Sequence, residues 1–137
     1  MVLDITKIEF YNITIDGQIS TASELLSTVV GAGVDFHAFK AIPVRPNKTQ
    51  FTLFAKDSSK LTEGAEKAGI KVDGPYSALL IKGDEKAGAL AGIYKKLSQA
   101  GIQVDEACGI ADINVGYGVI LYLVQENCSK ALDALEN

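Results

Sequence analysis

Apolar and polar residues alternate along some stretches of the first half of the chain and recur at helical spacing along others. Residues 8–15 alternate and are rich in β-branched and aromatic side chains, which predicts a strand. Residues 22–30 carry apolar side chains three or four positions apart, which predicts a helix that ends at Gly31-Ala32-Gly33. Further strands are predicted over residues 34–42, 50–55 and 70–72, with a helix between Asp57 and Gly69. Asp73-Gly74-Pro75 is the strongest predicted break in the chain.

The second half of the chain repeats this order. Strands are predicted over residues 76–81, 102–110 and 117–124, and a last helix begins at Asn127 or Ser129. A helix is predicted over residues 86–99, where Ala100-Gly101 ends it. Its predicted core face consists of five residues, namely Ala89, Leu90, Ile93, Tyr94 and Leu97.

Residues of the two halves match at a constant offset of 68 positions. The matched pairs are Asp16 and Asp84, Gly33 and Gly101, Ile42 and Ile110, and Leu53 and Leu121. A constant offset through strand, helix and strand favours an internal duplication, and such a repeat determines the fold. The alternative is that two unrelated α/β stretches share glycine helix stops.

The order strand-helix-strand-strand-helix-strand is that of a ferredoxin-like α+β unit, with an antiparallel sheet and both helices on one face. We therefore predict two such units, over residues 1–73 and 76–137, paired into one module. The second unit ends directly after its second helix and lacks a fourth strand. Residues 2–6 have strand-like alternation, and we hypothesise that they fill that vacant place in the second unit's sheet.

Composition and charge narrow the classes of function. The 137 residues are 47% hydrophobic and 22% charged, as in an ordinary globular chain. A formal net charge of −4 argues against general nucleic-acid binding. No apolar stretch approaches the roughly 20 residues that span a membrane, and no signal peptide begins the chain. The two cysteines form no disulfide framework, so we expect a reducing, cytoplasmic setting; Cys108 is expected to be buried in a strand.

The sequence shows no catalytic set, so we expect no enzymatic activity. His37 is the single histidine, and the chain has no P-loop, nucleophile elbow or dinucleotide fingerprint. We therefore expect no metal and no cofactor. An acylphosphatase-like enzyme would need an arginine in the first strand-helix loop, and neither residues 16–21 nor residues 83–89 contain one.

Residues 83–91, Gly-Asp-Glu-Lys-Ala-Gly-Ala-Leu-Ala, follow a predicted strand and open a predicted helix. This segment resembles the first loop of ACT domains, where an acidic residue, a glycine, a small residue and a leucine occur in that order. Residues 100–104 and 118–124 resemble the second and third strand regions of the same family. The resemblance covers residues 76–135 well and residues 8–72 more weakly.

The resemblance implies a tandem ACT protein that binds an amino acid or another small ligand for regulation. It also implies side-by-side pairing of domains, so the expected partner is a second copy of the chain or a regulated enzyme. Ligands of ACT pairs often lie at the junction between two domains. At that junction the resemblance places the starts of the two second strands, including Asp35 and Gln103.

The strand-helix loop of the second unit also suggests a ligand site on physical grounds. A glycine permits close approach to the backbone, and the unpaired N–H groups of a first helical turn attract a carboxylate. Ala87, Gly88, Ala89 and Leu90 form this turn, and Asp84 or Glu85 would meet an ammonium group. The alternative explanation is that Gly88 only permits tight helix-sheet packing and that the acids cap the helix.

The first unit departs from this pattern, because Ser20 and Thr21 occupy the positions of Gly88 and Ala89. Their hydroxyls could donate hydrogen bonds to a ligand, and the alternative is that they are helix caps. The first unit is then either structural or completes the second unit's pocket. If no ligand site is functional, the chain is instead a non-catalytic interaction or assembly module.

Overall fold

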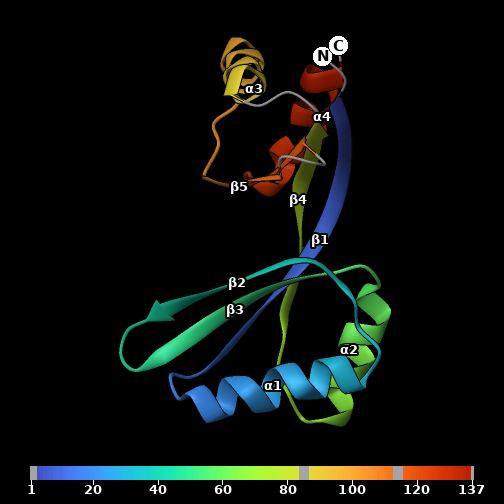
Figure 1. Ribbon diagram of the computed structural model, residues 1–137, viewed down its shortest axis with the longest axis vertical. Coiled ribbons are helices and arrows are strands. Elements are labelled where there is room, and N and C mark those ends of the chain that lie inside the picture. The colour runs from blue at the N-terminus through green and yellow to red at the C-terminus, as the bar shows by residue number, and fades with distance from the viewer. Residues whose placement is uncertain (1–2, 84–86, 113–115, 137) are drawn as a thin grey trace. The chain divides into compact units, whose positions relative to one another are not determined.

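A computed structural model describes residues 3–83, 87–112 and 116–136, which form six strands and four α-helices of an α+β fold (Figure 1). The elements are β1 (Leu3–Asp16), α1 (Ile19–Gly31), β2 (Phe36–Val44), β3 (Lys48–Ala55), α2 (Ser58–Lys67), β4 (Asp73–Gly83), α3 (Ala87–Gln99), β5 (Glu106–Asp112), β6 (Gly116–Tyr122), the 3₁₀ turn η1 (Gln125–Asn127) and α4 (Cys128–Glu136). The strands follow the order β2-β3-β1-β4-β6-β5 in an antiparallel sheet.

The chain divides into two compact units that do not coincide with its two halves. One unit is Glu9–Tyr76, and the other combines Met1–Ile8 with Ser77–Asn137. The boundaries fall at residues 8 and 76 rather than at residue 73. Strands β1 and β4 each begin in one unit and end in the other.

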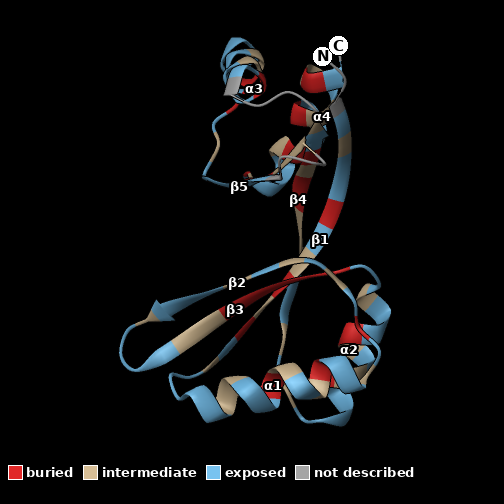
Figure 2. Ribbon diagram, in the orientation of Figure 1, coloured by how far each residue is buried: buried red, intermediate tan, exposed pale blue. Residues whose placement is uncertain are grey.

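The unit Glu9–Tyr76 encloses its core between strands and two helices that lie on the same side of β2 and β3 (Figure 1). β3 pairs with both β1 and β2, and its last five residues are buried (Figure 2). Helical spacing brings Leu25 and Val29 of α1 and Leu61 of α2 onto this core, where they meet Leu53. The predicted helices and the predicted third strand are therefore confirmed here.

The unit of Met1–Ile8 and Ser77–Asn137 has an equivalent core. Leu79 and Ile81 of β4 pack with Leu121 of β6 and with Ile93 and Leu97 of α3. Ile5, from the N-terminal segment, packs against the same cluster.

The side chain of Gln125 hydrogen-bonds to the backbone of β4 at Ser77. The Ser77 N–H donates to Oε1 of Gln125 at 2.6 Å, and Nε2 of Gln125 donates to the Ser77 carbonyl at 3.0 Å. An amide can hold both backbone groups of one residue because it carries a donor and an acceptor. This pair of bonds ties η1 to β4.

The offset of 68 positions recurs in the structure. α1 and α3 cover residues 19–31 and 87–99, which are the same 13 positions of the two halves. Both helices are followed by a glycine of positive φ, +81° at Gly33 and +71° at Gly101. The next N–H in each case bonds back into the helix, from Val34 to the Val29 carbonyl and from Ile102 to the Leu97 carbonyl. Because α1 and α3 end with the same glycine conformation, the chain leaves each helix in the same direction relative to its own axis, toward β2 and β5 respectively.

The predictions for residues 70–75 are wrong. Residues 70–72 are not a strand, and Asp73-Gly74-Pro75 does not break the chain but begins β4. Gly74 has a φ of +146°, and a Cβ there would lie 2.9 Å from the Phe10 carbonyl oxygen and from the Tyr11 ring. Glycine therefore permits close approach to β1 at this point instead of ending a strand.

Four further expectations need correction. Leu90 and Tyr94, predicted in the core face of α3, are each 42% exposed. Residues 102–105 precede β5 rather than belonging to it. β5 is an edge strand whose residues Glu106 to Ala111 are exposed, so Cys108 is exposed and not buried.

Candidate functional site

The first turn of α3 presents the backbone that the resemblance points to. Gly88 is the second residue of the helix and is exposed, and a Cβ built on it would meet no atom of the described residues within 4 Å. Packing against the described residues therefore does not require a glycine at this position. Ala89 is fully buried and anchors the turn, whereas Leu90 is partly exposed.

The remaining residues of this predicted site are only partly placed. Ala87 is the first residue of α3. Asp84 and Glu85 lie outside the residues that the structure describes. Their expected role toward an ammonium group stays a prediction.

The corresponding turn of α1 begins differently from the sequence prediction. Gln18 is the N-cap of α1, so Ser20 and Thr21 lie inside the first turn and the prediction that they cap it is wrong. Asp16, the last residue of β1, instead binds the backbone at this helix start. Its Oδ1 accepts a hydrogen bond from the Gln18 N–H at 3.0 Å. That bond and the hydroxyl of Thr21 lower the pKa of Asp16 below its ordinary value.

A hollow of about 400 Å³ lies at the other end of α3, within the unit Ser77–Asn137. It is bounded by the last turns of α3 and by the segment that leads to β5. Its lining consists of Tyr94, Leu97, Ser98, Gly101, Ile102, Gln103 and Val104. Leu97 and Ile102 are buried, whereas Ser98 and Gln103 are exposed. None of these seven described residues carries a charge.

The lining differs from the equivalent positions of the other unit. Phe36 corresponds to Val104 at the offset of 68, and Leu26 corresponds to Tyr94. Phe36 and Leu26 both pack against the core of Glu9–Tyr76. Asp35 corresponds to Gln103 and is exposed, and its carbonyl accepts the Lys56 N–H at 2.9 Å.

The structure does not bring all predicted site residues together within one unit. Ser20, Thr21 and Asp35 belong to Glu9–Tyr76, and the others belong to the second unit. Gly88 is near the start of α3, whereas Ser98 and Gln103 lie at its end. The rise of 1.5 Å per residue places Ser98 roughly 15 Å from Gly88 along α3. A small ligand at Gly88 therefore does not reach Ser98 of the same copy.

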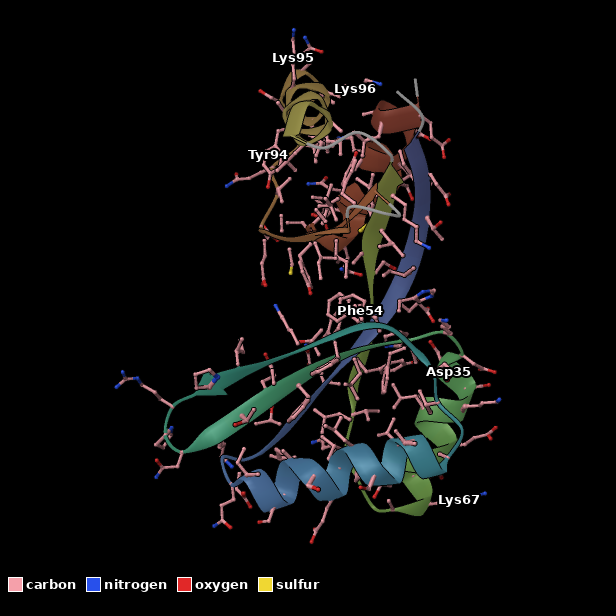
Figure 3. The ribbon with its side chains drawn as sticks, in the orientation of Figure 1. Asp35, Phe54, Lys67, Tyr94, Lys95 and Lys96 are labelled. Carbon is pink, nitrogen blue, oxygen red and sulfur yellow. The ribbon has the colours of Figure 1, made fainter. Side chains whose placement is uncertain are left out.

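Tyr94, Ser98 and Val104 were not recognised as lining residues from the sequence. Helical periodicity placed Tyr94 in the core face, but its ring lies on α3 beside the descending connection to β5 (Figure 3). The available signal was the exchange of Phe36 for the smaller Val104 between matched positions. A smaller side chain leaves a hollow only if neighbouring side chains do not move into the space. Whether they do depends on tertiary packing, which the local sequence does not show.

Cys128 belongs to the core, not to a reactive site. Cys128 is buried, and this burial raises the pKa of its thiol, although Lys7 opposes the shift. Among the described residues, no three His, Cys, Asp or Glu side chains are grouped as metal ligands would be. The helices of the described part of the chain are too short or too polar to span a membrane.

Comparisons with known proteins support the fold. No family model matches the sequence, and no curated protein sequence matches it. Protein BT0572 from Bacteroides thetaiotaomicron is similar in structure, with a TM-score of 0.83 at 15% identity, over 96% of this chain and 88% of that one.

Two regulatory subunits of aspartate kinase are also similar. The ligand-free subunit from Thermus thermophilus has a TM-score of 0.65 at 18% identity, over 98% of this chain and 93% of that one. The subunit from Thermus flavus has a TM-score of 0.59 at 14% identity, over 98% and 94%. These likenesses show that the chain shares the α+β fold of these structures.

Proposed function

We propose that this chain is a tandem ACT-like module that binds an amino acid and thereby regulates a separate enzyme. The observation that carries the proposal is the first turn of α3, where Gly88 is exposed and no described residue lies close enough to exclude a side chain. Glycine near a helix start costs stability relative to alanine, so its use at an open position favours a role in ligand approach.

The tandem organisation rests on the order of elements within each unit. Glu9–Tyr76 contains the end of β1, then α1, β2, β3, α2 and the start of β4, which is a ferredoxin-like order. The other unit reaches the same order only if the N-terminal part of β1 is its fourth strand. The packing of Ile5 on that unit's core supports this role.

In the proposed site, the backbone N–H groups of Gly88, Ala89 and Leu90 receive the ligand's carboxylate. The first N–H groups of a helix have no partner within the helix, and the helix dipole favours an anion there. Asp84 or Glu85 receives the ammonium group. In the first unit, the exposed position of Ser20 leaves its hydroxyl accessible to a ligand.

In the proposed site Gln103 comes from a second copy of the chain, because it follows the end of its own α3, whereas Gly88 is near the start. Asp35 likewise follows the end of α1, whereas Ser20 is near the start of that helix. We therefore propose a homodimer in which one copy contributes the start of α3 and the other contributes a second-strand start. The ligand would change the regulated enzyme by binding two arrangements of the dimer unequally.

A thermal-shift screen of the twenty amino acids tests the proposal. At least one amino acid should raise the melting temperature, because a ligand that binds only the folded state stabilises it. Gly88→Ala should abolish that shift while leaving the unliganded protein as stable or up to about 1 kcal/mol more stable. Gly31→Ala is the matched control, since Gly31 also lies in a helix with no neighbour to its Cβ position.

Exposed apolar side chains favour a second candidate, a non-catalytic interaction module. Ile19 and Val30 on α1 are 85% and 64% exposed, and Ile110 on the edge strand β5 is 79% exposed. Exposed apolar residues of this size are typical of protein-binding surfaces when they are contiguous. If no amino acid raises the melting temperature at millimolar concentration, this candidate replaces the first.

A further inference from the structure

The hollow at the end of α3 is formed by residues that the proposed carboxylate site does not use, apart from Gln103. Its base is apolar and buried, with Leu97 1% and Ile102 7% exposed. Tyr94 forms one wall and remains 42% exposed, so part of its ring is accessible. The volume of about 400 Å³ lies within the range of small-molecule sites, roughly 300–1,000 Å³.

Two matched positions differ in size at this hollow. Phe36, which packs against the core of its unit, corresponds to the smaller Val104, which packs against the other core, and Leu26 corresponds to the larger Tyr94. Gly101 adds no side chain, and a Cβ there would meet no atom within 4 Å. Val104 therefore leaves more room beside the last turns of α3 than a phenylalanine would.

The polar groups at this hollow are uncharged. The Ser98 hydroxyl and the Gln103 amide each supply a donor and an acceptor, and both side chains are exposed. Lys95 and Lys96 lie between Tyr94 and Leu97 on α3 but are not part of the lining, and the Lys96 ammonium donates to the Leu135 carbonyl at 3.5 Å. A charged ligand buried here would therefore lose hydration without gaining an ionic partner from the described lining.

We propose that this hollow is a second ligand site, which takes an uncharged aromatic molecule of one or two rings. The ring occupies the space left by Val104 and contacts Tyr94, as aromatic pairs do at offset or tilted geometry. An N–H or O–H group on the ring bonds to Ser98 or Gln103. This ligand class differs from the zwitterion of the first site. Within one copy, Ser98 lies roughly 15 Å from Gly88 along α3, whereas in the proposed homodimer Gln103 adjoins the carboxylate site of the other copy.

Indole is a direct probe, because the chain contains no tryptophan and indole fluorescence then reports only the added molecule. Titration of the full-length chain should change the indole emission saturably. Indole-3-acetate and tryptamine, which add a negative and a positive charge, should bind at least about tenfold more weakly. Absence of saturation at millimolar indole, or equal binding of the charged analogues, would overturn the proposal.

Substitutions at the hollow test whether indole binds there. Val104→Phe should fill the hollow and lower indole affinity by roughly tenfold or more, whereas Val30→Phe on the exposed face of α1 should leave it unchanged. Unchanged affinity in a folded Val104→Phe protein would contradict the site. If that variant does not fold, Gln103→Ala should weaken binding severalfold and Gln99→Ala should not. Equal effects of those two exposed substitutions would also refute it.

Discussion

Single carboxylates organise helix starts in this protein, and their effect depends on pH. Asp57 is the N-cap of α2, where Oδ1 accepts from the N–H groups of Ser59 at 3.0 Å and Lys60 at 3.4 Å. The hydroxyl of Ser59, followed by these N–H groups, lowers the pKa of Asp57 below its ordinary value of 3.8. The folded state therefore prefers the ionised carboxylate.

Replacement of Asp57 by alanine should lower the melting temperature at neutral pH. A lowered pKa stabilises the fold above the unfolded value, and this stabilisation is lost as pH falls through the folded pKa. The difference in melting temperature between wild type and Asp57→Ala should thus shrink in acid, as calorimetry across pH would show. Glu63→Ala, on the exposed side of the same helix, is the control, and a pH-independent difference for Asp57→Ala contradicts the assignment.

The two thiols should differ in reactivity. Cys108 is exposed on the edge strand, whereas Cys128 is 1% exposed and its Sγ lies 3.6 Å from the Ser77 carbonyl oxygen. Burial also raises the pKa of Cys128, so little thiolate forms there. A disulfide reagent should modify one thiol of the native chain, and Cys108→Ser should remove that reaction. Rapid modification of both thiols before unfolding would show that Cys128 is accessible.

Strand and helix elements were predictable where the apolar period was regular. The spacing and the glycine stop predict a helix over residues 86–99, and α3 occupies residues 87–99 with Gly101 after it. Leu90 and Tyr94 of its predicted core face are nevertheless exposed. β4 was not recognised as one strand, because Gly74-Pro75 ordinarily signals a turn. Only the close approach of Gly74 to Phe10 and Tyr11 explains a glycine there, and no local pattern encodes that contact.

Gly74→Ala should be strongly destabilising. The added Cβ would lie 2.9 Å from the Phe10 carbonyl oxygen, and a φ of +146° is unfavourable for alanine. Strain and overpacking together should cost about 2 kcal/mol or more in urea unfolding. Gly31→Ala should cost nothing or add stability, because its Cβ position is open. Similar unfolding of the two variants would refute the close approach.

For the whole molecule, the sequence indicated a duplicated order but not how the units share strands. The alternation indicates residues 2–6 and 8–15 as separate segments, whereas residues 3–16 form one continuous strand, β1. A long strand that contributes residues to two cores has no signature in the local sequence. Each part of it shows only the ordinary alternation of apolar and polar residues. The candidate site was similarly only half predictable: the α3 turn followed from a motif, whereas the hollow depended on packing around Val104.

Removal of residues 1–8 should destabilise one unit more than the other. Ile5 packs on the core around Leu79 and Leu121, so this core loses cover when the segment is deleted. Hydrogen exchange should then accelerate more at β6 than at β3, which belongs to Glu9–Tyr76. Equal acceleration in β3 and β6 would show that the N-terminal segment does not serve that core specifically.

The most direct test of the central proposal is a backbone amide NMR titration with the amino acid that raises the melting temperature most. The proposed site requires that the amide signals of Gly88, Ala89 and Leu90 move saturably and rank among the largest changes. Gly88→Ala should remove these changes while the rest of the spectrum stays folded. Changes confined to other parts of the chain, or none at saturating ligand, would contradict a carboxylate site at the start of α3.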